Sequence, residues 1–298
     1  MKLSRWAKKI AIACSLLSCT SSLLAADTLA RIRETQTITV AHREASFPFS
    51  FLSETKKPIG YSVDICLKIV EALKRELKMP QLTVRYLLVN PSSRIPSIVD
   101  GKADIECGST SNNAERRKQV SFAIPHFFAA ARMIVRTNSG IKNWTDLKDK
   151  KVVTTKGTTS VKLLNDRDQA RALGLQLIEG RDHNESFTMV ENGQADAFPM
   201  DDVLLFGLRA NAKDPEKFSI VGDALSTEPY GIMLRKDDPA FKTLVDHEIA
   251  RLMLDGEMTK FYDKWFRSPI PPKGTNLNMP MGILLRDNFR FPSDKVAD

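Results

Sequence analysis

Hydroxyl side chains and an arginine follow one another closely in the segment "ECGSTSNNAERRKQVSF" at 106–122. Ser109, Thr110 and Ser111 offer hydroxyl and main-chain carbonyl oxygens as acceptors, and Arg116 follows on the next turn. The planar guanidinium of an arginine binds a carboxylate through two parallel hydrogen bonds. The segment has little apolar surface to bury, yet strand-like sequence flanks it on both sides. This pattern predicts a cleft that holds a small zwitterion.

Two further segments offer complementary groups. "KGTTS" at 156–160 predicts a glycine turn into a helix, whose first amides favour an anion. Asp201 follows the strand-like "ADAFPM" and can receive an ammonium group. Each signal alone has a plainer explanation: an ordinary helix cap at 156–160, a surface charge at Arg116, or a cap on the next helix from Asp201 or Asp202. Together they complement both ends of an α-amino acid.

Strand-like and helix-like segments alternate after residue 36. A strand is predicted at 37–43, a helix at 61–80 on apolar residues at helical spacing, and a second strand at 82–89. The same rhythm restarts near residue 150 and continues to about residue 210. Such βαβ repetition predicts sheets with parallel strand pairs and covering helices.

The restart in the middle of the chain predicts an α/β protein with two lobes. Extended stretches at 130–137 and 228–235 would cross between them, and helices at 239–254 and 257–266 would return to the first lobe. The predicted divisions are 27–135 and 229–298 for the first lobe with its tail, and 136–228 for the second. The tail from Thr275 is predicted to be irregular. Ligands of such sheets bind outside the carboxyl ends of the strands, here in a cleft between the lobes.

The N-terminus predicts export. "MKLSRWAKK" is basic, "IAIACSLLSCTSSLLAA" is uncharged, and small residues stand at Ala25 and Ala26, so 1–26 has the pattern of a signal peptide rather than a membrane span. "LLSC", ending at Cys19, also resembles a lipobox, and an acyl chain there would anchor the protein to a membrane surface. Both forms of processing predict a periplasmic protein.

Charge and cysteine content exclude several classes of protein. The 298 residues include 44 Lys and Arg against 36 Asp and Glu; without the signal 40 basic residues remain, a net charge of +4. These are dispersed, so nucleic-acid binding is not expected. Export permits a Cys66–Cys107 disulfide, but sequence gives no distance and two buried free thiols are the favoured interpretation. The scattered histidines predict no metal site, and no cofactor is expected.

Longer motifs carry a resemblance to a known family. The chain resembles the periplasmic polar amino-acid-binding proteins of ABC importers (solute-binding protein family 3), and more narrowly those that take glutamate and aspartate. The motifs are "AHREASFPFSF", "SSRIPSIVDGKADIECGSTSNNAERRKQVSF", "KGTTSVKLLN", "DHNESF", "MDDVLL", "YGIMLRKDDP" and "WFRSPIPPKG". The resemblance implies the bilobal type II periplasmic-binding-protein fold. It also implies a monomer that passes L-glutamate or L-aspartate to permease subunits in the inner membrane.

The resemblance further implies a role for each site residue. The α-carboxylate would meet Arg116 and the amides of Thr158 and Thr159. The α-ammonium would meet Asp201 and acceptors at Ser109, Thr110 and Ser111. The distal carboxylate would meet Arg43, Arg94 and His183, with Ser109 assisting. This chain carries Pro91 where the related proteins have a serine, and Ser92 or Ser93 would have to compensate.

These charges predict the specificity of the site. Three arginines and one aspartate suit a ligand with two carboxylates, whereas glutamine or arginine would leave buried cations without a partner. Binding from both lobes should close the cleft about the crossing strands.

Two alternatives remain at this stage. The same fold carries cyclohexadienyl dehydratases, and Glu106 or Glu44 could serve as the general acid of such an enzyme. A receptor domain feeding a signalling protein is the other, although the sequence has no second membrane segment.

Overall fold

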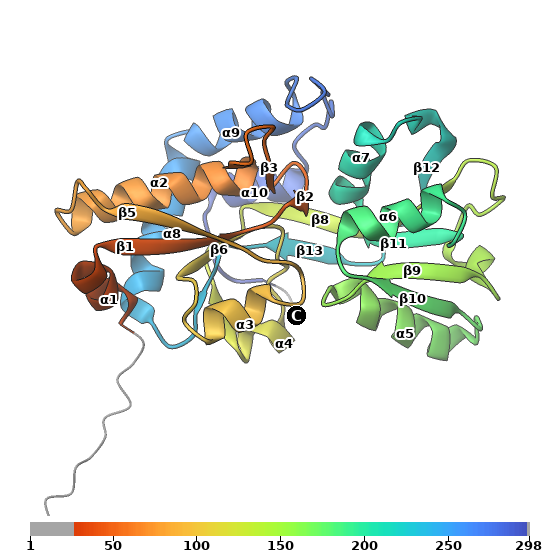
Figure 1. Cartoon of the computed structure of the whole chain (residues 1–298), viewed down its shortest axis with the longest axis horizontal. Helices are drawn as coiled ribbons and strands as arrows, with labels where there is room; N and C mark the ends of the chain where they lie inside the picture. The colour runs from red at the N-terminus through yellow and green to blue at the C-terminus, as the bar shows by residue number, and fades with distance from the viewer. Residues whose placement is uncertain (1–26, 297–298) are drawn as a thin grey trace, which may run out of the picture.

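Two mixed β-sheets divide the chain into two α/β lobes (Figure 1). The computed structural model describes residues 27–296; the predicted signal at 1–26, with Cys19, lies outside the described residues. Each lobe has helices packed on its own sheet, and strands run between the lobes at the middle of the molecule. The predicted fold class, a bilobal α/β protein with two crossing strands, is confirmed.

The first sheet has the order β5-β1-β6-β14-β7. Strand β1 runs parallel to β5 and to the central strand β6, whereas β14 returns antiparallel to β6 and β7. The sheet is mixed because the chain enters β14 on its return from the second lobe, in the direction opposite to β6. The strands are β1 (Thr37–His42), β5 (Thr83–Leu88), β6 (Ile105–Cys107), β7 (Val120–Phe122) and β14 (Met233–Arg235).

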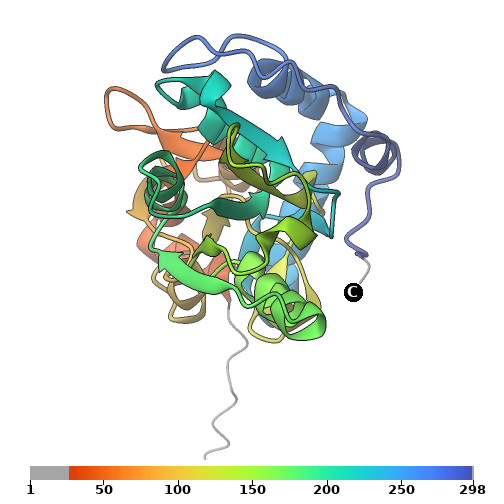
Figure 2. The ribbon, with the colours of Figure 1, turned by 90° about the vertical axis from the view of Figure 1, so that its right-hand side faces the viewer.

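The second sheet has the order β10-β9-β11-β8-β12. Strands β9, β10 and β11 are parallel, and α5 lies on one face while α6 and α7 lie on the other (Figures 1 and 2). The strands are β8 (Phe127–Arg136), β9 (Lys151–Thr155), β10 (Gln176–Gly180), β11 (Ala197–Asp201) and β12 (Phe218–Val221). The helices are α5 (Thr159–Arg171), α6 (His183–Glu191) and α7 (Asp202–Asn211), with short 3₁₀ turns η1 (Trp144–Leu147) and η2 (Pro215–Lys217).

Two connections join the lobes. The long strand β8 pairs through its first residues with β13 (Thr227–Tyr230) and through its later residues with β11 and β12. After β13 the chain passes Gly231 and Ile232 and enters the first sheet as β14. The extended stretch predicted at 228–235 is therefore two strands, and the pair β8–β13 forms the hinge between the lobes.

Helices cover the first sheet as the apolar spacing predicts. Cys66, Ile69, Val70 and Leu73 lie on one face of α2 and are all buried. Their burial, at about 25 cal/mol per Å² of apolar surface, holds the helix to the sheet. The helices of this lobe are α1 (Thr28–Thr35), α2 (Tyr61–Glu76), α3 (Arg94–Val99), α4 (Ala114–Arg117), α8 (Pro239–Leu254) and α9 (Glu257–Phe266).

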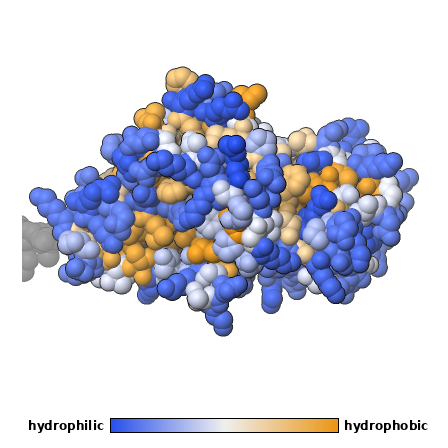
Figure 3. All heavy atoms as spheres, turned by 90° about the horizontal axis from the view of Figure 1, so that it is seen from above, coloured by the Kyte–Doolittle hydropathy of each residue, from blue (hydrophilic) through white to orange (hydrophobic). Residues whose placement is uncertain are grey.

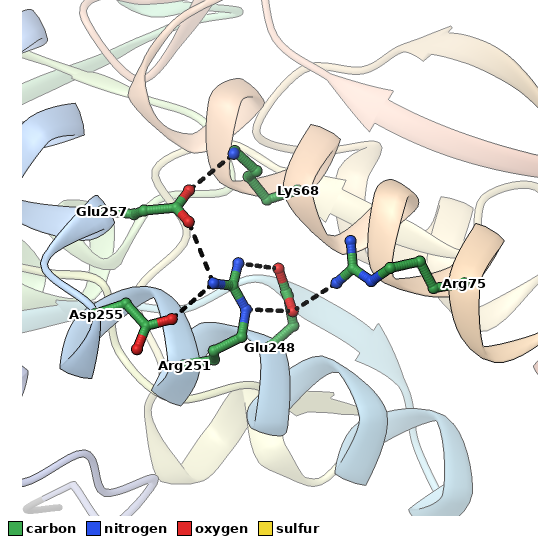
Figure 4. Close-up of polar contacts among 6 residues, drawn as sticks. All are labelled: Lys68, Arg75, Glu248, Arg251, Asp255 and Glu257. Atoms are coloured by element: carbon green, nitrogen blue, oxygen red, sulfur yellow. Dashed lines mark hydrogen bonds and ion pairs between the residues drawn. The ribbon is translucent and has the colours of Figure 1, made fainter.

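A charged network fixes α2, α8 and the start of α9 to one another (Figure 4). The Glu248 carboxylate is almost fully buried and accepts from Arg251 at 2.8 and 3.0 Å and from Arg75 at 3.3 Å. Arg251 also reaches Glu257, which pairs with Lys68 at 2.7 Å. The buried carboxylate thus has two cationic partners, which a buried charge requires.

Cys66 and Cys107 form a disulfide, so the interpretation of two free thiols is wrong. Cys66 lies on the buried face of α2 and Cys107 ends β6, and the packing of this helix on the sheet brings their Cα atoms to 6.3 Å. That distance is within the range that a disulfide spans. The sequence separation of 41 residues carried no information about it.

The tail is not irregular throughout, which corrects a second expectation. Residues Ile283–Arg290 form α10, whose Leu285 and Phe289 are buried one turn apart while Ile283 stays exposed. Asn288 donates to the Pro125 carbonyl oxygen at 2.7 Å and ties the helix to the segment before β8. A small sheet of β2 (Ala45–Ser46), β3 (Ser50–Leu52) and β4 (Pro58–Ile59) was also not predicted.

The surface seen in Figure 3 is mainly hydrophilic, with hydrophobic side chains in separate patches. Within residues 27–296, none of the helices combines the length and the hydropathy that a membrane crossing demands.

Candidate functional site

The predicted site residues lie where the strands of both sheets end. Arg43 follows β1 directly, Ser109 lies two residues beyond β6, and Asp201 is the last residue of β11. His183 begins α6, after β10, and Thr159 begins α5, after β9. Carboxyl ends of parallel strands open at the same edge of a sheet, so the topology gathers side chains from distant parts of the sequence.

All ten predicted residues are shielded from solvent. Eight are buried, and Thr158 and Thr159 are half-buried. The side chains of Arg43, Arg94 and Arg116 belong to residues that are only 1%, 3% and 8% exposed. Arginine is rarely buried without a partner, so the plainer explanation of these residues as solvated surface charges is wrong.

The segment at 109–112 is buried because its backbone pairs with the hinge. Thr110 accepts from the Gly231 amide at 3.1 Å, and the Asn112 amide donates to the Pro229 carbonyl oxygen at 2.7 Å. These bonds satisfy main-chain groups that would otherwise be costly to bury. They also explain why a segment with few apolar side chains lies inside the protein.

Two of the arginines bridge the lobes. Arg94 donates to the carbonyl oxygens of Ser109 at 3.4 Å and Gly157 at 3.3 Å. Arg116 donates to the carbonyl oxygens of Ser111 at 3.0 Å and Gly157 at 3.3 Å. Gly157 belongs to the turn before α5, so the first lobe and the second are joined at one oxygen by two cations.

His183 joins the third arginine to the second lobe. Its Nε2 lies 3.4 Å from Arg43 Nη2, and its Nδ1 lies 3.0 Å from Thr155 Oγ1. A guanidinium can only donate, so Nε2 accepts and the ring proton sits on Nδ1, which donates to Thr155. Burial, and then the charges of Arg43 and Arg94, hold the pKa of His183 well below its usual range. The ring is therefore neutral at pH 7.

Burial and mutual repulsion make the charged forms of the arginines less favourable, although Glu106, Glu228 and Asp201 oppose this effect. Burial, and then the charge of Arg94, lower the pKa of Arg43 and of Arg116 to about 9. Burial also lowers the pKa of Arg94 itself. A shift in this direction means that the site disfavours cations and gains from an anion placed among them.

Asp201 brings a buried carboxylate, rather than a cation, to the same site. Its Oδ2 accepts a hydrogen bond from the Tyr230 hydroxyl of the hinge. Burial, and then the charge of Glu228, raise the pKa of Asp201 to about 7, although Tyr230 and Arg116 oppose the shift. A buried carboxylate whose charged form is disfavoured in this way is stabilised by a neighbouring cation.

The choice between Asp201 and Asp202 as a helix cap is resolved by their contacts. Asp201 occupies the cap position of α7 but makes no side-chain capping bond there. The Asp202 carboxylate instead accepts from the amides of Ala130, at 3.1 Å, and Val203, at 2.7 Å. The Asp201 carboxylate is therefore not used to cap the helix, and its Oδ1 has no partner among the described residues.

Four of these residues carry polar atoms that are buried without a hydrogen-bond partner among residues 27–296. The atoms are Arg43 Nη1, Arg94 Nε, Ser109 Oγ and Asp201 Oδ1. An unsatisfied buried donor or acceptor costs about 1–3 kcal/mol, and more when it is charged. Two are guanidinium donors, which suit a carboxylate of a ligand, and one is a carboxylate acceptor, which suits an ammonium group.

Sequence reasoning missed Glu228 and Tyr230 as residues that shape the site, and it considered Glu106 only as the acid of a dehydratase. Glu106 is fully buried, accepts from the Thr110 hydroxyl at 2.7 Å and lies within electrostatic reach of Arg43 and Arg94. Glu228 and Tyr230 come from the hinge. The count of one acid against three arginines was thus incomplete. The extended stretch predicted at 228–235 marked the hinge but not which of its side chains face the site.

Glu228 links the hinge to the second lobe. It accepts from the Thr159 hydroxyl at 3.2 Å and from the Ser226 hydroxyl at 2.8 Å. The Thr158 hydroxyl donates to the Thr155 carbonyl oxygen at 2.7 Å, which closes the turn before α5. The threonine side chains are therefore occupied, and the Thr158 amide also donates to the Thr155 carbonyl oxygen, at 3.3 Å.

Pro91 lies against the second lobe. An added Cβ on Gly157 would stand 2.7 Å from the Pro91 carbonyl oxygen, so only glycine allows this approach. Ser92 donates to the Lys156 carbonyl oxygen at 3.3 Å, and Ser93 Oγ accepts from the Asn90 amide at 3.0 Å. The two serines that would replace the missing hydroxyl thus have other partners.

Comparison with known proteins gives a consistent picture. Residues 38–268 match the profile of the bacterial extracellular solute-binding proteins, family 3. The chain is 51% identical over 272 residues to the L-glutamate/L-aspartate-binding protein of Pseudomonas aeruginosa, covering 91% of this chain and 90% of that one. It is 44% identical over 274 residues to the glutamate/aspartate import solute-binding protein of Escherichia coli K12, covering 92% and 91%.

Solved structures agree on the fold. An ancestral arginine-binding protein, solved with arginine bound, matches with a TM-score of 0.70 at 28% identity and covers 78% of this chain and 98% of that one. Since that fold accepts a cationic amino acid in another protein, selectivity must come from the side chains of the site.

Proposed function

The chain belongs to the bacterial extracellular solute-binding proteins of family 3, and from this premise we propose that it captures L-glutamate or L-aspartate between its lobes and delivers it to an ABC importer. The observation that carries the proposal is that three buried guanidinium groups, two with unpartnered nitrogens, lie within electrostatic reach of one another, and Asp201, with its unpartnered oxygen, lies within reach of Arg94 and Arg116.

Each end of the ligand has a proposed partner. Arg116 and the backbone amides of Thr158 and Thr159 take the α-carboxylate, where a fork of two N–H groups and a helix N-terminus favour an anion. Asp201 takes the α-ammonium, with acceptors at Ser109, Thr110 and Ser111.

The distal carboxylate lies with Arg43, Arg94 and His183. The free nitrogens Arg43 Nη1 and Arg94 Nε support this assignment because each has a hydrogen to donate and no acceptor within the described part of the chain. His183 accepts from Arg43 and holds it in place. With its neutral ring, His183 adds no charge of its own and leaves the two guanidinium groups to select the carboxylate.

Selectivity follows from the cost of leaving these groups unpaired. Glutamine presents an amide where the arginines need a negative charge, so it would leave buried cations without neutralisation. Arginine would add a third cation to that end of the site. Glu106 and Glu228 offset part of the positive charge of the arginines. Glu106 Oε2 accepts from Thr110, and Glu228 accepts from Thr159 and Ser226.

An enzymatic role does not fit. Family 3 is a family of solute-binding proteins, and the names of both relatives describe binding or import. Glu106, the candidate acid of a dehydratase, is fully buried and accepts from Thr110, and Glu44 is exposed. The protein is a binding protein.

A thermal-shift screen of the mature protein against the common amino acids tests the proposal. A ligand that binds only the folded state raises Tm in proportion to the logarithm of its concentration above Kd. Glutamate and aspartate should raise Tm and the others should not. A screen in which neither acid raises Tm would refute the proposed ligand.

The place of action and the partners are part of the same proposal. As a member of an extracellular family the protein acts outside the cytoplasm, and we assign it to the periplasm as a monomer that docks on permease subunits in the inner membrane. Mass spectrometry of the mature N-terminus distinguishes cleavage after residue 26 from an acylated Cys19.

A further inference from the structure

The lobes also touch at a place that includes none of the proposed ligand residues. Phe47, between β2 and β3, packs against Gly207 in α7 of the second lobe. A Cβ built on Gly207 would lie 2.8 Å from both the ring carbon Cδ1 and the carbonyl oxygen of Phe47. This approach is so close that only glycine fits at position 207 when the lobes are together.

A lysine makes a second contact beside the first. Lys273 Nζ donates to the carbonyl oxygens of Asn211 at 2.8 Å and Ala212 at 3.0 Å, at the C-terminal end of α7. The last carbonyls of a helix lack partners within it and carry partial negative charge. Lys273 also lies within electrostatic reach of Glu191, the last residue of α6. The lysine therefore meets negative charge from two helices of the second lobe.

Lys273 itself belongs to the first lobe. Its loop is tied to the end of α9: the Ile270 amide donates to the Thr275 carbonyl oxygen at 3.0 Å, and Asn276 donates to the Arg267 carbonyl oxygen at 3.0 Å. Ile270 is buried in the core of that lobe. Figure 1 shows this blue loop after α9 on the side that faces α7.

Both contacts border one hollow of about 260 Å³ between the lobes. Glu44 and Asn184 line it as well, and they directly follow Arg43 and His183 in the sequence. The contacts therefore lie just outside the end of the site proposed for the distal carboxylate. Unlike the bonds of Arg94 and Arg116, they can be changed without touching a ligand-binding side chain.

We propose that Lys273 and the Phe47–Gly207 contact form a latch that exists only when the lobes are closed and that sets the affinity for both acidic amino acids without affecting the choice between them. The proposal rests on the proposed function. Partners on different lobes separate when the hinge opens, so each contact favours the closed form alone. Measured affinity scales with the population of the closed form, hence every ligand of the site shares the effect equally.

Lys273→Ala removes the cation from the latch. Lys273 is an exposed residue, so the substitution should leave the Tm of the ligand-free protein unchanged. Isothermal titration should give a Kd about fivefold higher for glutamate and for aspartate alike, with their ratio unchanged. Lys273→Arg, which keeps the charge, should restore most of the affinity. Lys162→Ala is the matched control, because Lys162 pairs only with Asp166 of its own helix in the ion pairs described.

Gly207→Ala tests the other half of the latch. It should raise Tm and weaken binding together, a combination that a loss of stability cannot produce. Alanine favours a helix interior over glycine, so the ligand-free, open protein should gain a few degrees in Tm. The new methyl group meets Phe47 only on closure, so both Kd values should rise, by about tenfold.

Three results would overturn the latch. Wild-type Kd values in both Lys273→Ala and Gly207→Ala would show that the contacts do not favour closure. A change in the glutamate-to-aspartate ratio would place them in the ligand site. If the wild-type protein binds neither acid, the proposed function fails and the latch fails with it, whereas the first two results refute the latch and leave the function intact.

Discussion

Arg94 and Arg116 both donate to the carbonyl oxygen of Gly157, each at a distance of 3.3 Å. Two guanidinium groups of the first lobe thus share a single neutral acceptor in the second. A neutral oxygen cannot balance two positive charges, which burial makes costly. The arrangement gains most when an anion enters between them, and that gain is available only when both lobes are in contact. Ligand charge and lobe closure are therefore coupled at this point.

The two arginines should respond differently to truncation. Arg116→Ala removes the fork proposed for the α-carboxylate, which every amino acid carries, so affinity for glutamate should fall by at least about 100-fold. Arg94→Ala should weaken glutamate and aspartate but bring glutamine closer to them, because the group that requires a distal charge is gone.

Isothermal titration of both variants with glutamate and glutamine measures this division. Lys118→Ala, two residues from Arg116 and paired only with Glu115 in the ion pairs described, is the control and should behave as wild type. Equal losses for both ligands in both variants would contradict the separate roles.

Asp201→Asn should stabilise the ligand-free protein while it abolishes ligand binding. The folded-state pKa of about 7 lies above the unfolded value near 3.8, so the native state holds a proton between pH 4 and pH 7 that the unfolded state has lost. Wild-type stability from this group is therefore greatest below pH 4 and declines as the pH rises through 7.

Denaturant unfolding at several pH values measures the effect. Asparagine imitates the neutral carboxyl at every pH, so the variant should exceed wild type by about 4 kcal/mol at pH 8, and the difference should shrink toward pH 4. If the difference in the free energy of unfolding does not vary with pH, the pKa of Asp201 is not raised in the native protein.

The disulfide should contribute to stability but not to recognition. Replacing both Cys66 and Cys107 by serine should lower the free energy of unfolding by about 2–4 kcal/mol, because the bridge restricts a loop of about 40 residues in the unfolded chain. The Kd for glutamate should stay within about twofold of wild type, as α2 lies behind the sheet. A large loss of affinity with little loss of stability would mean that the bridge positions the site instead.

Much of the site could be predicted because strand ends have a sequence signature. Arg43 follows "TITVAH" and Asp201 ends "AFPMD", so the alternation of β and α segments fixes which edge of the sheet each residue occupies. The residues that the hinge contributes to the site could not be predicted in the same way. Tyr230 and Glu228 lie on a crossing strand, where the face of each side chain depends on a register that only the pairing with β8 determines.

Distances between residues that are far apart in the sequence could not be predicted. The Cys66–Cys107 pair depends on how α2 packs on β6, and no spacing along the chain encodes that angle. The tail helix was missed because a short segment with two buried residues, Leu285 and Phe289, has too few turns for periodicity to stand out. Lys273 belongs to the "WFRSPIPPKG" motif, which does not reveal its contact with the end of α7, because that contact depends on where the helix ends in space.

Titration of the wild-type protein with glutamate, aspartate, glutamine and arginine at pH 7 tests the central claim most directly. If buried guanidinium groups select a second carboxylate, both acids should bind tightly, glutamine at least about 100-fold more weakly, and arginine not at all. Glutamine binding as tight as that of glutamate would contradict the account.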